Sequence, residues 1–236
     1  MAELLDSPIQ ANARTPQEKT MNPSLNKIYK ILFKAYGGQC WWPGDTPFEI
    51  SIGAILTQNV SWKNVETAIR NLKTEKLLSP KSLYSASNKK IAALIRPTGY
   101  YNQKTIKIKN FLMWFNGYNF SFKRLERIDL RPLRDELLSI NGIGPETADS
   151  ILLYALSKKV FVVDAYTKRI FGRLGILSEK SAYHEIQNLF HRHFKGNVDD
   201  YNEYHALIVK HGKDICMTKP VCGKCCISVL CRNRNT

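Results

Sequence analysis

The stretch that decides the fold is residues 137–148, with the sequence LLSINGIGPETA. It predicts a helix, a tight turn built on Gly142 and Gly144, and a second helix that Pro145 opens at its first position. Glycine permits backbone angles that other residues avoid and lets a backbone approach a ligand closely. Amide groups at the start of the second helix point outward with the helix dipole behind them, which suits a phosphate group. The alternative is an ordinary packing turn, and the spacing alone does not choose between the two.

Apolar residues recur at helical spacing on both sides of this hairpin. The pattern predicts helices that include residues 27–36, 104–116, 131–139, 145–156, 165–174, 181–193 and 202–213. Only residues 160–163 have the composition of a strand, and no partner strand is evident. We therefore expect an all-α protein of roughly ten helices, without a fixed repeat.

The composition excludes several classes of protein. The 236 residues include 35 Lys and Arg against 20 Asp and Glu, a formal net charge of +15, and 44% are hydrophobic. That hydrophobic share is too high for a disordered chain, and no apolar run reaches the ~18 residues of a membrane-spanning helix. A basic excess of this size is typical of proteins that bind nucleic acid, although a merely soluble basic surface gives the same count. No apolar signal-peptide stretch opens the sequence, so we expect a cytoplasmic protein, associated with the nucleoid in a prokaryote.

Five of the six cysteines crowd into the C-terminal segment. A disulfide framework spreads its cysteines along the chain, so this crowding indicates one metal site. The spacing Cys216-x5-Cys222-x2-Cys225-x5-Cys231 suits a [4Fe–4S] cluster, and four-cysteine zinc is the physical rival. Cys226 is an extra thiol beside Cys225, and spacing favours Cys225 without closing the choice.

An acidic residue stands at a helix start beyond the hairpin. Asp164 follows the apolar residues 160–163 directly and precedes the helix predicted to begin at residue 165. The common use of aspartate at such a position is as a helix N-cap. Beside Tyr166, Lys168 and Arg169, the same carboxylate would stay ionised and face a developing cation, and the two roles are compatible.

The Gly-Ile-Gly hairpin, the Val-Val-Asp segment about twenty residues on and the terminal four-cysteine loop resemble the helix-hairpin-helix DNA glycosylases of the endonuclease III superfamily. The resemblance covers residues 28–231 and implies a two-lobed fold, a helical barrel plus an iron–sulfur lobe. It implies base excision from double-stranded DNA, in which a nucleotide is flipped out and its N-glycosidic bond is broken. Asp164 matches the family's catalytic aspartate, and such a carboxylate stabilises an oxocarbenium-like transition state and orients or deprotonates water.

The position after the hairpin departs from part of that family. Members that also cut the strand carry a lysine two residues after the second glycine, and its amine forms a Schiff base with the sugar. Here that residue is Glu146, which cannot form an imine, so we expect a substrate-binding residue and hydrolysis without a strong lyase step. Lys158 and Lys159 are the candidate substitutes, although nothing in the sequence places them. Among members without the lysine, the chain is most similar to the 3-methyladenine DNA glycosylase III branch, over residues 41–43, 53–59, 96–104 and 142–149.

That branch suggests how the lesion and the DNA are held. An alkylated purine is cationic and already a good leaving group, so its selection depends on stacking against electron-rich rings. Trp42 and Trp62 are the candidate walls, with core packing as the alternative for one of Trp41 and Trp42. The resemblance implies that Gln58 fills the gap left by flipping and that Tyr100 wedges the opposite strand. Without the resemblance, they would be a helix-capping glutamine and a surface tyrosine.

These observations lead to one domain scheme and three functional hypotheses. We expect a polar, disordered N-terminus over residues 1–26, a helical barrel over 48–158, and a second lobe from 27–47 and 159–236, with Asp164 at the cleft between the lobes. The leading hypothesis is a monomer, not associated with a membrane, that removes alkylated purines, 3-methyladenine first, by hydrolysis. One alternative is an endonuclease III-like glycosylase and lyase for oxidised or mismatched pyrimidines. The other is a module that binds damaged DNA without catalysis.

Overall fold

The structure, a computed structural model, describes residues 24–39, 41–178 and 180–233. Within those ranges the regular elements are α-helices joined by short 3-10 and π segments, and no strand is present. The all-α expectation is therefore confirmed. Residues 160–163, whose composition suggested a strand, form irregular backbone that is fully buried. No helix in the described ranges has the length and apolar character needed to cross a lipid bilayer.

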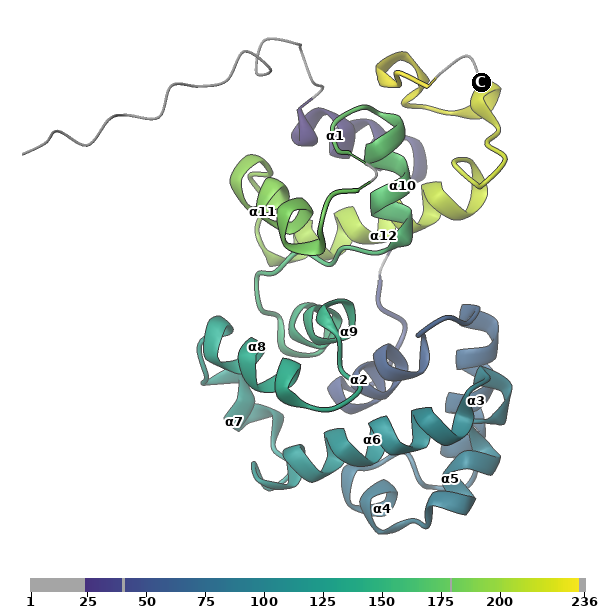
Figure 1. Cartoon of the computed structure of the whole chain (residues 1–236), viewed down its shortest axis with the longest axis vertical. Helices are drawn as coiled ribbons and strands as arrows, with labels where there is room; N and C mark the ends of the chain where they lie inside the picture. Colours follow the sequence, from purple (N-terminus) through teal and green to yellow (C-terminus); the bar gives the residue numbers. More distant parts are fainter. Residues whose placement is uncertain (1–23, 40, 179, 234–236) are drawn as a thin grey trace, which may run out of the picture.

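The helices form two groups, which Figure 1 shows one above the other. The barrel group contains α2 (Pro47–Leu56), α3 (Trp62–Thr74), α4 (Pro80–Ser85), α5 (Asn88–Leu94), η2 (Arg96–Thr98), α6 (Tyr101–Asn116), α7 (Phe122–Glu126), α8 (Leu130–Ser139) and α9 (Pro145–Ser150). The terminal group contains α1 (Leu25–Tyr36), α10 (Ala165–Arg173), α11 (Tyr183–His193) and α12 (Val198–Asp214). The cysteine-bearing segment follows α12 and includes the short turns η4 (Cys222–Lys224) and η5 (Ser228–Leu230).

The start of α1 corrects one expectation. Leu25 and Asn26 were expected in the disordered N-terminal segment, and they form the first turn of the helix instead. The side chain of Ser24 accepts a hydrogen bond from the amide of Lys27, which caps the helix, and Leu25 is 3% exposed. Residues 1–23, the rest of that expected segment, lie outside the described residues.

The segment η3 (Ile151–Ala155) joins the two groups. The sequence predicts one helix over residues 145–156, but the chain is α-helical only to Ser150 and then π-helical. Every residue of η3 is buried, and it packs against α2 on the barrel side and α12 on the other. The wider winding therefore lies where the helix is enclosed on two sides. The domain boundaries at residues 48 and 158 stay a prediction.

Both ends of the described chain contribute to the terminal group. Helix α1 packs on α12 and α11, and the hydrogen bond from Asn26 to His193 spans 167 residues of the sequence. The Tyr204 hydroxyl donates a hydrogen bond to the carbonyl of Leu25 (2.9 Å), and the Tyr36 hydroxyl is hydrogen-bonded to His211 Nδ1 (2.6 Å). The terminal group, in which Asp164 precedes α10, is thus built from distant parts of the sequence.

Candidate active site

The predicted hairpin is present between α8 and α9. Gly142 has φ = 95°, and a Cβ atom there would lie 2.4 Å from Cγ of Lys107, so both backbone and packing require glycine. Gly144 is the N-terminal residue before α9, and a Cβ there would meet no atom within 4 Å. Its surroundings are therefore open on the outer side of the turn. The assignment of these two glycines to DNA phosphates stays a prediction.

Asp164 caps α10, as its position indicates. Its Oδ1 atom accepts hydrogen bonds from the amide (2.7 Å) and the hydroxyl (2.8 Å) of Thr167. Its Oδ2 atom lies 3.5 Å from Nε2 of His205, and the residue is 9% exposed. Burial by itself raises the pKa of Asp164, but His205 and Thr167 outweigh burial and lower the pKa below its usual value. The carboxylate is therefore ionised although it is buried.

Glu146 belongs to the same electrostatic environment. It lies in the first turn of α9, and burial of its carboxyl group, followed by the negative charge of Asp164, raises its pKa. His205 and Lys168 oppose that rise. The residue as a whole remains exposed. Two neighbouring carboxyl groups with pKa values shifted in opposite directions are typical of a catalytic site.

The structure separates both candidate substitute lysines from this pair. The ammonium group of Lys158 donates hydrogen bonds to the carbonyls of Glu126 and Ile128, each at 2.8 Å. Lys159 lies over the ring of Tyr201, with 5.2 Å between its Nζ atom and the ring centroid. The amine whose charge reaches Glu146 belongs to Lys168, which the sequence analysis did not single out as a substitute amine. Lys168 follows Asp164 by four residues, about one turn of helix, and this spacing was the signal in the sequence that it lies near that aspartate.

The tryptophans gather, but not as parallel walls. The rings of Trp42 and Trp62 meet edge to face, with centroids 5.1 Å apart and an interplanar angle of 89°. Trp41 contacts both of them, and Trp42 also packs against Tyr154, with 5.0 Å between centroids. A base cannot lie between two rings in edge-to-face contact, so stacking there requires one ring to move. Trp42 and Trp62 also line a cavity of about 410 Å³ that includes Glu49.

Gln58 and Tyr100 lie on two adjacent loops of the barrel group. The Gln58 amide donates to Thr147 Oγ1 (2.9 Å) and to the carbonyl of Gly142 (3.3 Å), and Lys107 donates to its side-chain oxygen. Gln58 is therefore fixed on the hairpin and caps no helix. Tyr100 is 72% exposed with φ = 45°, at the start of α6. Its side chain is therefore accessible, and its assignment as the wedge of the opposite strand stays a prediction.

A buried lysine ties these two loops together, and sequence reasoning missed it. Lys104 is 2% exposed, and its ammonium group donates to the carbonyl of Leu56 (2.9 Å) and to that of Thr98 (2.7 Å). Leu56 ends α2 two residues before Gln58, and Thr98 ends η2 two residues before Tyr100. Burial, with a smaller effect of the Lys107 charge, lowers the pKa of Lys104 to about 8. A lysine in an amphipathic helix gives no sequence signal for such a role.

Four of the C-terminal cysteines share a cavity. Cys216, Cys222, Cys225 and Cys231 line a space of about 470 Å³ together with Arg173. The Cys226 thiol does not line it and lies 3.9 Å from the hydroxyl of Tyr36. Across the described ranges, no three His, Cys, Asp or Glu side chains converge as ligands of a single metal ion. The four predicted cysteines therefore border one cavity, and their assignment as cluster ligands stays a prediction.

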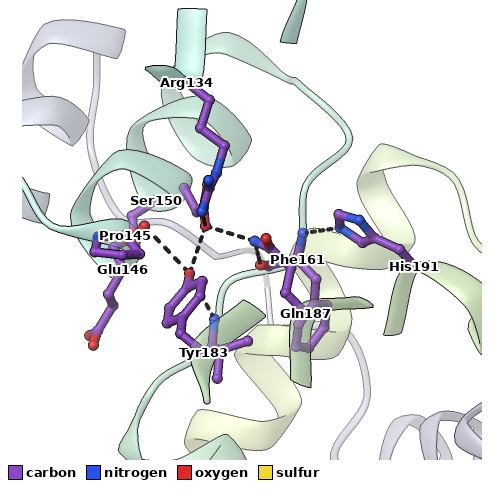
Figure 2. Close-up of polar contacts among 10 residues, drawn as sticks. Arg134, Pro145, Glu146, Ser150, Phe161, Tyr183, Gln187 and His191 are labelled. Carbon is purple, nitrogen blue, oxygen red and sulfur yellow. Dashed lines mark hydrogen bonds and ion pairs between the residues drawn. The ribbon is translucent and has the colours of Figure 1, made fainter. Parts of the chain in front are cut away.

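A buried carboxylate links the hairpin to the terminal group. Asp149, on α9, is 0% exposed and receives Nε (2.6 Å) and Nη2 (3.0 Å) of Arg134 from α8. Tyr183 (2.8 Å) and Gln187 (2.7 Å), both from α11, donate to the same carboxylate. Figure 2 shows Arg134, Tyr183 and Gln187 converging, while Glu146 extends away from them. We call this set the Asp149 network.

The Asp149 network also holds the segment that leads to Asp164. The side chain of Gln187 donates to the carbonyl of Phe161 (2.8 Å), and the hydroxyl of Tyr183 accepts from the amide of Val163 (3.3 Å). Figure 2 shows His191 reaching the same segment, where its Nε2 atom accepts from the amide of Phe161 (3.0 Å). Residues 160–163 are therefore positioned by side chains rather than by a neighbouring strand.

Comparison with known proteins agrees with this geometry. Residues 52–195 match the family model of the HhH-GPD superfamily base excision DNA repair proteins. The chain is 50% identical to "Putative DNA repair glycosylase MJ1434" of Methanocaldococcus jannaschii, over 89% of this chain and 96% of that protein. It is 32% identical to Endonuclease III of Sulfolobus acidocaldarius, over 78% of this chain and 81% of that protein.

Solved structures show the same fold. The H. pylori 3-methyladenine DNA glycosylase (MagIII) bound to 1,N6-ethenoadenine superimposes with a TM-score of 0.69 and 28% identity, over 79% of this chain and 96% of that one. A non-covalent Endonuclease III–DNA complex superimposes with a TM-score of 0.76 and 21% identity, over 89% of this chain and 94% of that one. The matched residues include the hairpin, Glu146 and Asp164, and the chain belongs to the HhH-GPD superfamily as a DNA N-glycosylase of base excision repair.

Proposed function

We propose that this glycosylase removes alkylated purines, 3-methyladenine first, from double-stranded DNA by hydrolysis and without a strong lyase step. The observation that carries the proposal is Glu146, a carboxylate beside Asp164 at the position where lyases of the family hold a lysine. A lysine ammonium there would repel a cationic base, whereas a second carboxylate attracts it. The 28% identity to a 3-methyladenine DNA glycosylase of the same fold supports this substrate class.

The chemistry follows from the charge of the base. An alkylated purine leaves as a neutral molecule, so the enzyme needs no strong general acid to protonate it. The sugar becomes cationic as the bond breaks, and the ionised Asp164 stabilises that charge in a site of low polarity. Its Oδ1 atom is occupied by Thr167, so Oδ2 is the oxygen that faces the sugar or orients the attacking water.

The remaining residues place the DNA. Gly142 and Gly144 bring backbone amides to phosphates, Gln58 occupies the vacated stack, and Tyr100 enters the opposite strand. Trp42 and Trp62 stack on the flipped base once their edge-to-face contact opens. The net charge of +15 supports the attraction of a monomer to the duplex, and in a prokaryote the site of action would be the cytoplasmic nucleoid.

A [4Fe–4S] cluster belongs to the same proposal. Cys216, Cys222, Cys225 and Cys231 would hold it, because these four thiols line one cavity that excludes Cys226. Such a cluster supplies a structural cross-link rather than a step of the hydrolysis. Arg173 donates to Cys216 Sγ (3.3 Å) and to the carbonyl of Met217 (2.6 Å), which ties the segment to α10.

The test is to identify the base that is released. Duplexes that contain 3-methyladenine or an oxidised pyrimidine are incubated with enzyme, freed bases are measured by mass spectrometry, and strand breaks are scored with and without alkali. We expect free 3-methyladenine and breaks only after alkali, and Asp164→Asn should bind lesion DNA but release no base. Base release by Asp164→Asn at the rate of the parent enzyme would contradict the assigned mechanism.

Lys168 supports a second candidate, a glycosylase with lyase activity on pyrimidines. Its charge reaches Glu146, so an amine is present near the site although the hairpin position lacks one. Borohydride trapping distinguishes the two candidates. A trapped enzyme–DNA adduct that disappears in Lys168→Ala, together with release of oxidised pyrimidines, would replace the leading proposal.

A further inference from the structure

His205 is a buried histidine beside the candidate catalytic carboxylate. It projects from α12, is 4% exposed, and lies between Tyr154 of η3 and Asp164. Its Nδ1 atom is hydrogen-bonded to the hydroxyl of Tyr154. Its Nε2 atom has no hydrogen-bond partner among the described residues and lies 3.5 Å from Asp164 Oδ2. One ring nitrogen is therefore satisfied, and the other faces the carboxylate.

The hydrogen-bond inventory decides which nitrogen carries the proton. Burial and the charge of Asp164 raise the pKa of Tyr154 well above its usual value, against a smaller opposing contribution from Trp41, so its hydroxyl keeps its proton. The acceptor available to that hydroxyl within the described residues is Nδ1 of His205. When the ring is neutral, Nδ1 therefore accepts this hydrogen bond, and the single N–H is on Nε2, directed at Asp164.

The two oxygens of Asp164 then have different surroundings. Oδ1 receives two hydrogen bonds from Thr167, which also begin helix α10. Oδ2 lies 3.5 Å from Nε2 of His205, slightly beyond an ordinary hydrogen bond. A buried donor that lacks a partner is costly, so a small movement that shortens this contact is favourable. Such a movement would direct Oδ2 and stabilise its negative charge.

We propose that Tyr154 and His205 form a positioning relay, in which the Tyr154 hydroxyl donates to Nδ1 and the Nε2–H of His205 orients Oδ2 of Asp164. The inference rests on the catalytic role proposed for Asp164. His205 is a positioning residue, because it acts on the sugar and water only through that carboxylate. The relay joins η3, α12 and α10, and so depends on the junction between the barrel group and the terminal group.

The test compares three variants under single-turnover conditions. His205→Leu removes the N–H, and we expect the rate of base release to fall about 10- to 100-fold, the range of a lost hydrogen bond to a charged group, with DNA affinity unchanged. His205→Gln retains an N–H near the Nε2 position and should recover most of the rate. His184→Leu, an exposed histidine on α11, is the matched control and should equal the parent enzyme.

Nitrogen-15 NMR of the histidine rings gives a readout that is independent of the variants' folding. The relay requires the unprotonated shift at Nδ1 of His205 in the parent protein, and Tyr154→Phe should change the tautomer population. A protonated Nδ1 in the parent would overturn the proposal. So would an unchanged rate in His205→Leu while Asp164→Asn is inactive, and that result would leave the proposed function intact. An active Asp164→Asn would instead remove the proposed function itself.

Discussion

Replacing Asp149 with asparagine removes a fully buried negative charge that four hydrogen bonds hold between the two groups of helices. Two of these bonds come from Arg134, and one each from Tyr183 and Gln187. All three partners act as donors in these bonds, so the amide nitrogen of asparagine would leave at least one N–H or O–H without an acceptor. The substitution keeps the size of the side chain and changes its charge and one acceptor.

The expected cost follows from burial. Removing one partner of a buried ion pair costs roughly 3–5 kcal/mol, because the other charge is left without compensation. The side chain of Arg134 is 24% exposed, whereas that of Asp149 is 0% exposed, so water relieves part of the penalty on the arginine. We therefore expect a loss of about 3 kcal/mol in the free energy of unfolding. For a chain of this length, that loss lowers Tm by roughly 6–12 °C.

Urea and thermal unfolding, followed by circular dichroism, measure the change. Asp135→Asn is the matched control, because Asp135 is exposed on α8 beside Arg134 and its replacement should cost under about 0.5 kcal/mol. The Asp149 network also holds residues 161 and 163, so base release should slow in the Asp149 variant at temperatures where it is folded. A variant within about 1 kcal/mol of the parent would refute the assigned energetic role of the network.

Three further predictions rest on separate contacts. Lys104→Met should slow base release from a duplex but not from a substrate whose lesion is already extrahelical, because the carbonyls of the two loop ends lose the donor that they share. Lys89→Met, on the exposed face of α5, is the control. Equal slowing on both substrates would argue against a role of Lys104 in holding the two DNA-contacting loops. Burial lowers the pKa of His191, so its contribution to stability is complete above pH 6.5 and is lost as the pH falls below that value. In urea unfolding, the free energy of unfolding of His191→Gln should therefore fall less steeply than that of the parent as the pH is lowered. An unchanged dependence on pH would contradict this. Cys222→Ser should lose the visible absorption of the cluster while Cys226→Ser keeps it, and the reverse pattern would show that the ligands are wrongly assigned.

The parts of the structure that local sequence signals control were predictable. Residues 137–148 combine apolar spacing, two glycines and a proline, and each acts on its own turn of backbone. Asp164 is an N-cap because its side chain reaches an amide only three residues away. The cysteine spacing likewise confines four thiols to one short segment. In each of these cases the signal and its consequence lie within one short stretch of chain.

The residues that sequence reasoning missed act across long separations. Lys104 contacts a carbonyl 48 residues earlier, and His205 contacts a hydroxyl 51 residues earlier. Nothing near either residue in the sequence distinguishes it from an ordinary lysine or histidine of an amphipathic helix. The arrangement of Trp42 and Trp62 was equally out of reach, because composition gives the presence of aromatic rings but not the angle between them.

The pairing of α1 with α12 has a consequence for biosynthesis. The carbonyl of Leu25 accepts its hydrogen bond from Tyr204, which is 179 residues later in the chain. At 5–20 residues per second, the ribosome therefore synthesises Tyr204 about 9–36 s after Leu25. Until α11 and α12 are made, the apolar face of α1, with Ile28 and Leu32, lacks these two packing partners. The helices of the barrel group are contiguous in the sequence, so this group can fold first as it emerges. Helix α1, although it is synthesised first, is then one of the last to dock and is a natural client for chaperones.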